Sequence, residues 1–192
     1  MRRRLLKRAW AGPAFFAVLL FCALAAAQEG GRDVHFSAVR EGELIKVSAS
    51  VELAVDRALA WEVLTDYGHY ASFISGLDES RVVGRHAQGL IVEQKGAIGV
   101  FFFKQSVRTR LLVTESPPAS VVSRGLEGSF KDLNGRYDLQ PTASGIRLQY
   151  SGSFIPDFYL PPLIGMALVR YNLERNFSEL AAEIVKRGAY RK

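Results

Sequence analysis

The sequence predicts an α+β fold in which a curved antiparallel β-sheet wraps around one long C-terminal α-helix, with two short helices after the first strand. Three observations predict it: apolar and polar residues alternate strictly over residues 45–55, strand-like segments follow one another from Leu77 to Phe154, and an apolar stripe with helical spacing runs through Leu163–Arg187. Short connections between consecutive strands imply antiparallel pairing. The long helix carries enough apolar surface to cover the sheet.

The first part of the domain combines strands with short helices. Residues 34–39 form a short strand, and the alternation over residues 45–55 predicts a long strand with one buried face. Asp56 is a suitable N-cap for a helix over Arg57–Asp66. A second short helix is expected over His69–Ile74.

The middle of the chain is predicted to be a meander of strands joined by turn residues. Gly96 and Gly99 lack the residues and the following helix of a phosphate-binding loop, and they predict a bulge or bend within a strand. The expected strands are Ser80–Arg85, Leu90–Phe103, Gln105–Glu115, Ser120–Leu126, Phe130–Gln140 and Gly145–Phe154.

The last helix begins after Pro161 and Pro162 and continues to Arg187. Its apolar residues recur at steps of three and four, which is the spacing of a single buried stripe, whereas charged residues occupy the opposite side. The stripe consists of Met166, Val169, Leu173, Phe177, Leu180 and Ile184.

The N-terminus has the three parts of a secretory signal peptide. A head with five basic residues precedes the apolar run Ala14–Ala27, which ends in three alanines. The alternative is an uncleaved anchor in the inner membrane, although Gly12 and Pro13 interrupt the apolar run near its start. We therefore expect a signal peptide at 1–27, a linker at 28–33, one globular domain at 34–187 and a tail at 188–192. The predicted location is the periplasm, with the export route left open.

Charge and cysteine content exclude several classes of function. The net charge is +6, but the signal carries five basic and no acidic residues, which leaves 20 basic against 19 acidic residues. A nucleic-acid-binding domain would need a basic surface, so we predict no nucleic-acid partner. The only cysteine, Cys22, lies in the signal, which excludes thiol chemistry in the domain. His35, His69 and His86 lack metal-ligand spacing, and we predict neither a metal nor a cofactor.

Several segments carry a family resemblance in the same order along the chain. Ala60–Tyr67 is followed by Phe73–Leu77, and later by Gly128–Lys131 and Asn134–Leu139. Together they resemble the START-type (SRPBCC) helix-grip superfamily, in the branch that joins coenzyme-Q-binding proteins with polyketide cyclases and dehydrases. The resemblance implies a deep apolar cavity between sheet and helix that holds a lipid, a quinone or a polycyclic molecule. Members include both binding proteins and enzymes, so the fold alone does not choose between them.

The alternation of side chains along each strand and the apolar stripe of the last helix identify the side chains that we expect to face this cavity. The tyrosines among them can orient a ligand through their hydroxyl groups. The predicted ligand-binding residues are Val107, Leu111, Tyr137, Leu148, Tyr150, Met166, Leu173 and Phe177. A second aromatic group, consisting of Phe101, Phe103, Phe158 and Tyr159, either packs against neighbouring segments or makes transient contact with a membrane.

The pattern favours an exported, non-catalytic protein that binds or transports a hydrophobic small molecule or lipid. A cyclase or dehydratase is the first alternative, and it would need an inward acid or base such as a tyrosine, Glu93 or Asp132. The second alternative is an interaction module of the cell envelope whose cavity is filled by side chains such as Phe102, Met166 and Phe177. The sequence does not specify the oligomeric state.

Overall fold

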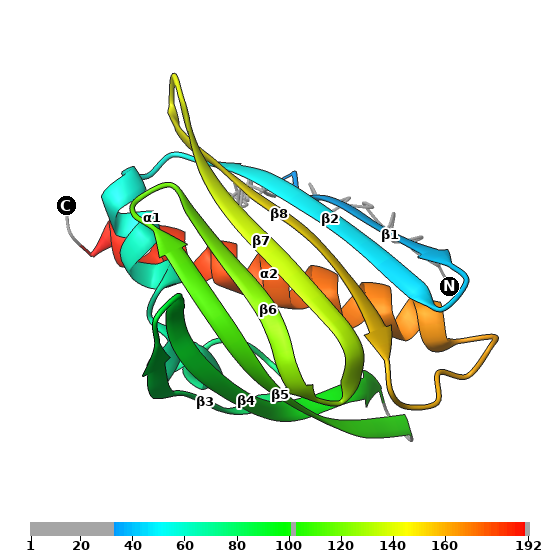
Figure 1. The fold of residues 1–192 in the computed structure, drawn as a ribbon. Coiled ribbons are helices and arrows are strands. Elements are labelled where there is room, and N and C mark those ends of the chain that lie inside the picture. Colours follow the sequence, from blue (N-terminus) through cyan, green and yellow to red (C-terminus); the bar gives the residue numbers. More distant parts are fainter. Residues whose placement is uncertain (1–32, 101–102, 191–192) are drawn as a thin grey trace, which may run out of the picture. The chain divides into compact units, whose positions relative to one another are not determined.

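The fold is a single antiparallel sheet curved around a long helix, as predicted from the sequence (Figure 1). The chain divides into Met1–Gly31 and Arg32–Lys192, and the computed structural model describes residues 33–100 and 103–190. The sheet has eight strands in the order β1-β2-β8-β7-β6-β5-β4-β3. Helix α2 crosses its inner face. Among the described residues, no helix is sufficiently long and apolar to span a bilayer.

The elements follow the predicted order, and the two short helices lie between β2 and β3. The strands are β1 (His35–Glu41), β2 (Leu44–Leu53), β3 (Leu77–His86), β4 (Gly89–Val100), β5 (Phe103–Ser116), β6 (Ser120–Gly128), β7 (Phe130–Thr142) and β8 (Gly145–Pro156), and the helices are α1 (Arg57–Leu64), the 3-10 helix η1 (Tyr67–Ser72) and α2 (Gly165–Ala189).

The two short helices differ in detail from the prediction. Helix α1 ends at Leu64, and the second helix is a 3-10 helix that starts at Tyr67. Asp56 occupies the N-cap position with extended backbone angles, but its side chain makes no capping hydrogen bond. Only its carbonyl oxygen takes part in the helix, accepting a hydrogen bond from Ala60 at 3.1 Å.

The predicted bulge lies in β3 and not in β4. Strand β4 pairs with β5 without a register shift, whereas β3 has two irregularities, one between Leu77 and Glu79, where it meets Gly96, and one between Val82 and Gly84. The backbones approach closely at the first irregularity, where a Cβ atom at Gly96 would collide with the carbonyl oxygen of Gly76. That oxygen accepts a hydrogen bond from Ala97 N at 2.8 Å. Gly96 therefore joins the sheet to the segment that follows η1.

The core lies between the sheet and α2. The main cluster includes Leu139 and Leu148 of the sheet, Val63 of α1, and Leu180 and Ile184 of α2, all of them almost fully buried. A second cluster, around Ile45, Phe154 and Val169, packs near the N-terminal end of α2. The alternation along the strands and the helical stripe account for both clusters, since each places apolar side chains on one face.

Candidate ligand-binding cavity

A cavity of about 250 Å³ remains between the inner face of the sheet and α2. Its lining comes from all eight strands, with β3 contributing Leu77, and from α1, η1, Ile74 and α2. Every second side chain of a strand faces inward, and on α2 the side chains spaced by three or four residues face the sheet. Most of the lining is apolar, and no charged side chain belongs to it among the described residues.

Five of the eight predicted ligand-binding residues line the cavity, namely Leu111, Tyr137, Tyr150, Leu173 and Phe177.

The other three predicted residues do not line the cavity. Leu148 is completely buried in the main core, and Met166 packs against the second cluster near the start of α2. Val107 is half-buried, four residues from the cavity-lining Leu111 along β5. Alternation along a strand determines the face to which a side chain points. Whether the side chain also reaches the cavity depends on its position along the strand.

Other lining residues were not predicted. Tyr67 and Tyr70 come from η1, where a spacing of three places them on one side of the 3-10 helix. Gln94, Thr109 and Asn176 add polar groups. The spacing in η1 is a signal that the sequence contains, but the contact of η1 with the sheet interior is visible only in the folded chain.

The two η1 tyrosines have protein partners for their hydroxyl groups. Tyr70 donates a hydrogen bond to the carbonyl oxygen of Leu64 at 2.6 Å, and Tyr67 donates one to Oε1 of Glu115 at 2.9 Å. Burial raises the pKa of both hydroxyls far above its usual range, and the Glu115 carboxylate raises both further. Both groups are therefore neutral hydrogen-bond donors whose capacity is already used.

Tyr137 and Tyr150 form a second pair, in which neither hydroxyl has a partner in the described part of the chain. They are register partners on β7 and β8, with ring centroids 4.7 Å apart. No hydrogen bond joins either hydroxyl to another described residue, and neither oxygen is among the fully enclosed unpartnered atoms, which are Thr142 Oγ1 and Arg175 Nε. Burial raises the pKa of Tyr150 to about 12, and burial together with nearby tyrosines raises the pKa of Tyr137 well above its usual value.

Two glycines make room for the Tyr150 hydroxyl at the floor of the cavity. Gly135 and Gly152 are register partners on β7 and β8. A Cβ atom at Gly135 would lie 3.1 Å from the Tyr150 hydroxyl and 2.9 Å from Ser123 Oγ, and one at Gly152 would collide with that hydroxyl. The tip of the Tyr150 side chain therefore lies against the two glycines.

The two carboxylates considered for catalysis lie away from the cavity. Glu93 pairs with Arg81 at 3.1 Å and with Arg110 at 3.9 Å. Asp132 is exposed and accepts a hydrogen bond from Asn134 at 2.9 Å. Within residues 33–100 and 103–190, no group of three or more His, Cys, Asp or Glu side chains is arranged to hold a metal ion.

An ion-pair cluster connects the segment between α1 and η1 to the end of α2. Arg187 contacts Asp66 at 2.7 Å and Glu183 at 2.9 Å, and His69 Nδ1 lies 2.6 Å from Asp66. Burial raises the pKa of Asp66, but the hydrogen bonds from His69 and Arg187 outweigh it and hold that pKa below its usual range. Because Tyr67 and Tyr70 lie in η1, this cluster holds one wall of the cavity in place.

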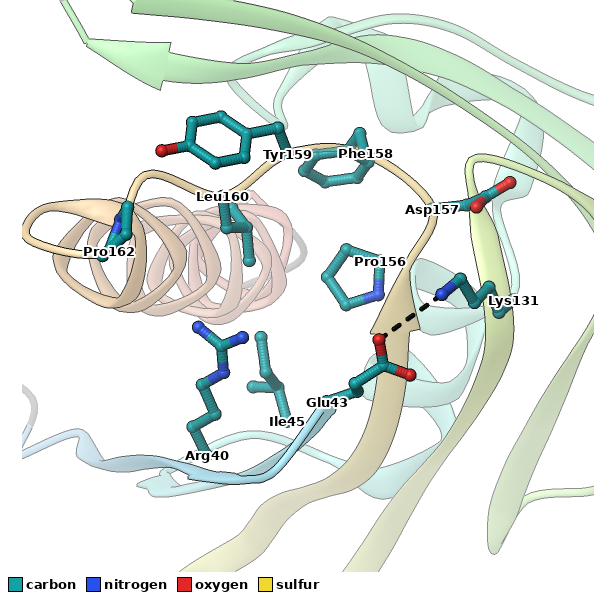
Figure 2. A pocket seen from close by; sticks show the side chains of 10 residues that line it. All are labelled: Arg40, Glu43, Ile45, Lys131, Pro156, Asp157, Phe158, Tyr159, Leu160 and Pro162. Carbon is teal, nitrogen blue, oxygen red and sulfur yellow. Dashed lines mark ion pairs between the residues drawn. The ribbon is translucent and has the colours of Figure 1, made fainter.

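A separate open pocket of about 540 Å³ lies between the β1–β2 turn, β7 and the loop before α2 (Figure 2). Two bases and two acids line it, and Lys131 pairs with Glu43 at 3.5 Å. Because these charges balance and the pocket is open, we consider the internal cavity to be the candidate site.

Two of the four aromatic residues predicted to contact a membrane also line this open pocket. Tyr159 is 71% exposed, whereas the ring of Phe158 packs against Phe130 at a centroid distance of 5.8 Å. Phe101 and the side chain of Phe103 lie outside the described residues.

Comparison with known proteins agrees with this geometry. A profile of the family described as polyketide cyclase / dehydrase and lipid transport matches residues 45–188. No curated protein matches the sequence.

Solved structures of low sequence identity share the fold. A START superfamily protein from Mycobacterium smegmatis has 16% identity and a TM-score of 0.62, over 73% of this chain and 97% of that chain. The Zhui aromatase/cyclase from Streptomyces sp. R1128 has 17% identity and a TM-score of 0.59, over 75% and 95%. A STAR-related lipid transfer protein from Xanthomonas axonopodis has 13% identity and a TM-score of 0.61, over 79% and 92%.

Proposed function

We propose that this chain, which belongs to the polyketide cyclase / dehydrase and lipid transport family, binds or carries a hydrophobic small molecule in the cavity between the sheet and α2. The observation that carries this proposal is the cavity itself, which is mostly apolar and, among the described residues, free of charged side chains. Such a lining with a few polar groups is typical of small-molecule sites.

An interaction module with a filled interior is the less favoured alternative. Phe177 lines the cavity without closing it, and Met166 lies outside its lining. Phe102, the third residue considered as a filler, lies outside the described residues. About 250 Å³ of space remains beside these side chains, which supports binding over filling.

The proposal includes export. Residues 1–27 are proposed to be a cleaved signal peptide, residues 28–33 a linker, residues 34–187 the binding domain and residues 188–192 a tail. In that location the ligand would be an envelope lipid, a quinone or a polycyclic compound, and aromatic residues including Tyr159 would contact the membrane transiently. N-terminal sequencing of protein from a periplasmic extract tests this, with cleavage after Ala27 expected. Recovery of the intact chain in the membrane fraction would favour the anchored form.

Binding is tested first with the natural ligand. The domain is purified without detergent, extracted with organic solvent, and the extract is analysed by mass spectrometry. We expect one class of neutral apolar compound that is absent from a mock purification. No such compound, together with no binding of lipids, quinones or small aromatic compounds, would contradict the proposal.

A pair of variants on one strand locates the binding site. Ser123→Leu places a larger apolar side chain in the cavity, and Val122→Leu changes the neighbouring residue on the exposed face of β6. We expect Ser123→Leu to weaken binding by about tenfold or more, which corresponds to about 1.4 kcal/mol. The control should bind like the wild type. Equal affinity of the two variants at equal thermal stability would mean that the ligand binds elsewhere.

One contact favours a catalytic function as the second candidate. Tyr67 lines the cavity and its hydroxyl donates a hydrogen bond to the Glu115 carboxylate, so a linked hydroxyl and carboxylate that can relay a proton lie beside its wall. A dehydratase would remove a hydroxyl group and an adjacent hydrogen from the substrate as water. Incubation with small cyclic β-hydroxyketones and mass spectrometry would detect this loss, and Tyr67→Phe should abolish it. Identical product formation with and without the protein would exclude this candidate for these substrates.

A further inference from the structure

We infer that the cavity selects neutral compounds of one or two rings that carry a hydrogen-bond acceptor, and that the hydroxyls of Tyr137 and Tyr150 recognise this acceptor. The inference rests on the proposed binding function and specifies the class of ligand for the same cavity. Three features carry it: the volume of the cavity, the absence of charge in its lining, and the unused hydrogen-bonding capacity of this tyrosine pair.

The volume limits the size of the ligand. An apolar cavity of about 150 Å³ in a protein core binds one benzene molecule. The cavity under α2 measures about 250 Å³, which is less than twice that volume. Sites for larger, drug-sized ligands span roughly 300 to 1,000 Å³. A compound with two fused rings therefore fits inside the cavity, whereas a complete two-chain lipid would have to extend beyond it.

The lining excludes charged ligands. It contains no Lys, Arg, His, Asp or Glu among the described residues, and its polar members are hydroxyls and amides such as Thr109 and Asn176. A carboxylate transferred into such a site would lose its hydration without gaining a counter-ion, which is strongly unfavourable. Fatty acids in their ionised form are therefore poor ligands, and the preferred ligand is neutral.

The tyrosine pair supplies free donors at the cavity surface. The hydroxyls of Tyr67 and Tyr70 already donate to Glu115 and to Leu64, at 2.9 and 2.6 Å. The hydroxyls of Tyr137 and Tyr150 have no such partner among the described residues and are not fully enclosed, so they are available to donate to a ligand in the cavity. Because burial raises their pKa values, Tyr137 and Tyr150 keep their protons at physiological pH. A carbonyl or ether oxygen on the ligand would complete these hydrogen bonds.

The test compares two probes that differ only in the acceptor. Indane is a two-ring hydrocarbon, and 1-indanone has the same skeleton with one carbonyl oxygen. Titration calorimetry measures both with the purified domain and with Tyr137→Phe, Tyr150→Phe and the double variant. Tyr190→Phe, which removes a hydroxyl from an exposed position, is the matched control. Thermal unfolding checks that each variant is folded, and stability should change little because no protein hydrogen bond is lost.

We expect the wild type to bind 1-indanone about threefold to tenfold more tightly than indane, the advantage conferred by one net hydrogen bond. The double variant should lose this preference while its affinity for indane is unchanged, and Tyr190→Phe should keep it. Decanoate and pyrene, which test charge and size, should bind more weakly than 1-indanone.

Several outcomes would overturn the inference but not the proposed function. Equal affinities for indane and 1-indanone, or a preference that survives in the double variant, would refute recognition by the tyrosines. Tighter binding of decanoate would refute the requirement for neutrality, and tighter binding of pyrene would refute the size limit. If no probe binds and the solvent extract of the native protein is empty, the proposed function itself fails.

Discussion

Replacing Arg187 with methionine should release the short helices from the end of α2. The substitution keeps an unbranched apolar stem near the ring of Phe73, over which the guanidinium lies at 5.7 Å. It removes the contacts with Asp66 at 2.7 Å and with Glu183 at 2.9 Å. Asp66 keeps its contact with His69, and Glu183 keeps its contact with Lys186.

The expected loss of stability follows from the exposure of these groups. Hydrogen bonds to charged groups contribute about 1.5 to 3 kcal/mol when buried, whereas exposed ion pairs contribute about 0.2 to 1 kcal/mol. The side chains of Arg187 and Asp66 are 32% and 25% exposed, so the pair lies between these limits. We expect Arg187→Met to lower the free energy of unfolding by about 2 kcal/mol, or the melting temperature by about 4 to 8 °C.

The dependence on pH provides a second test of the same cluster. Burial raises the pKa of Glu183, but hydrogen bonds from Arg187 and Lys186 outweigh it, and the pKa values of Asp66 and Glu183 are both lowered. A carboxyl group whose folded pKa is depressed stabilises the fold above its unfolded pKa, and this contribution is lost as the pH falls through the folded value. The stability difference between wild type and Arg187→Met should therefore be largest near neutral pH and should shrink below about pH 4.

Urea unfolding measures these changes, and the adjacent residue supplies the control. Lys186 is 61% exposed and, within residues 33–100 and 103–190, pairs only with Glu183 at 3.1 Å, so Lys186→Met should lower the free energy of unfolding by less than about 1 kcal/mol. Hydrogen exchange should become faster in η1 in Arg187→Met only. If Arg187→Met loses no more stability than Lys186→Met, or if its loss does not change between pH 7 and pH 3, the cluster does not anchor η1.

Three further predictions follow from the packing. Gly96→Ala should lower the free energy of unfolding by about 1 to 3 kcal/mol, because the new methyl group would collide with a backbone carbonyl oxygen. Urea unfolding measures this change, and Gly68→Ala is the control because its methyl group would meet open space. Leu148→Ala should lower the free energy of unfolding by about 2 to 5 kcal/mol, because it leaves a cavity in the core. Leu126→Ala, at a half-exposed position, should change it little in the same assay. The free energy of unfolding should fall as the pH rises above about 10, because the pKa of Tyr150 and the other cavity tyrosines is higher in the folded than in the unfolded chain. Spectrophotometric titration should show these tyrosines ionising together with unfolding.

Each of these predictions has a contrary outcome. Equal stability of Gly96→Ala and Gly68→Ala would mean that the backbones can separate at no cost. A loss below about 1 kcal/mol for Leu148→Ala would place that residue outside the tight core. Ionisation of all tyrosines near pH 10 without unfolding would show that the cavity tyrosines are open to bulk water.

The local patterns of the sequence were sufficient to predict the fold. Alternation over residues 45–55 identifies a strand without reference to any other part of the chain, and the spacing from Met166 to Ile184 identifies a helix in the same way. Short turns then restrict the strands to antiparallel pairing with their neighbours. These signals depend on residues close in sequence, and the sheet and α2 agree with them.

Contacts between distant residues determined the details that the patterns did not reveal. The first irregularity of β3, between Leu77 and Glu79, lies where the backbone of Gly76 approaches Gly96, twenty positions later in the chain. Nothing in the local sequence of β3 signals it, since the constraint arises only when the segment after η1 packs against β4.

The cavity shows the same division. Alternation and helical spacing placed Leu111, Tyr137 and Phe177 on inward faces, and these side chains line the cavity. The same rule applied equally to Leu148, which the folded chain buries in the core beyond the cavity. Periodicity determines the direction of a side chain, but the space left in front of it depends on which side chains arrive from the other elements. The hydroxyl of Tyr67 finds its partner 48 residues away in the chain, whereas the hydroxyls of Tyr137 and Tyr150 have none among the described residues. Only the tertiary structure, therefore, distinguishes the two kinds of tyrosine.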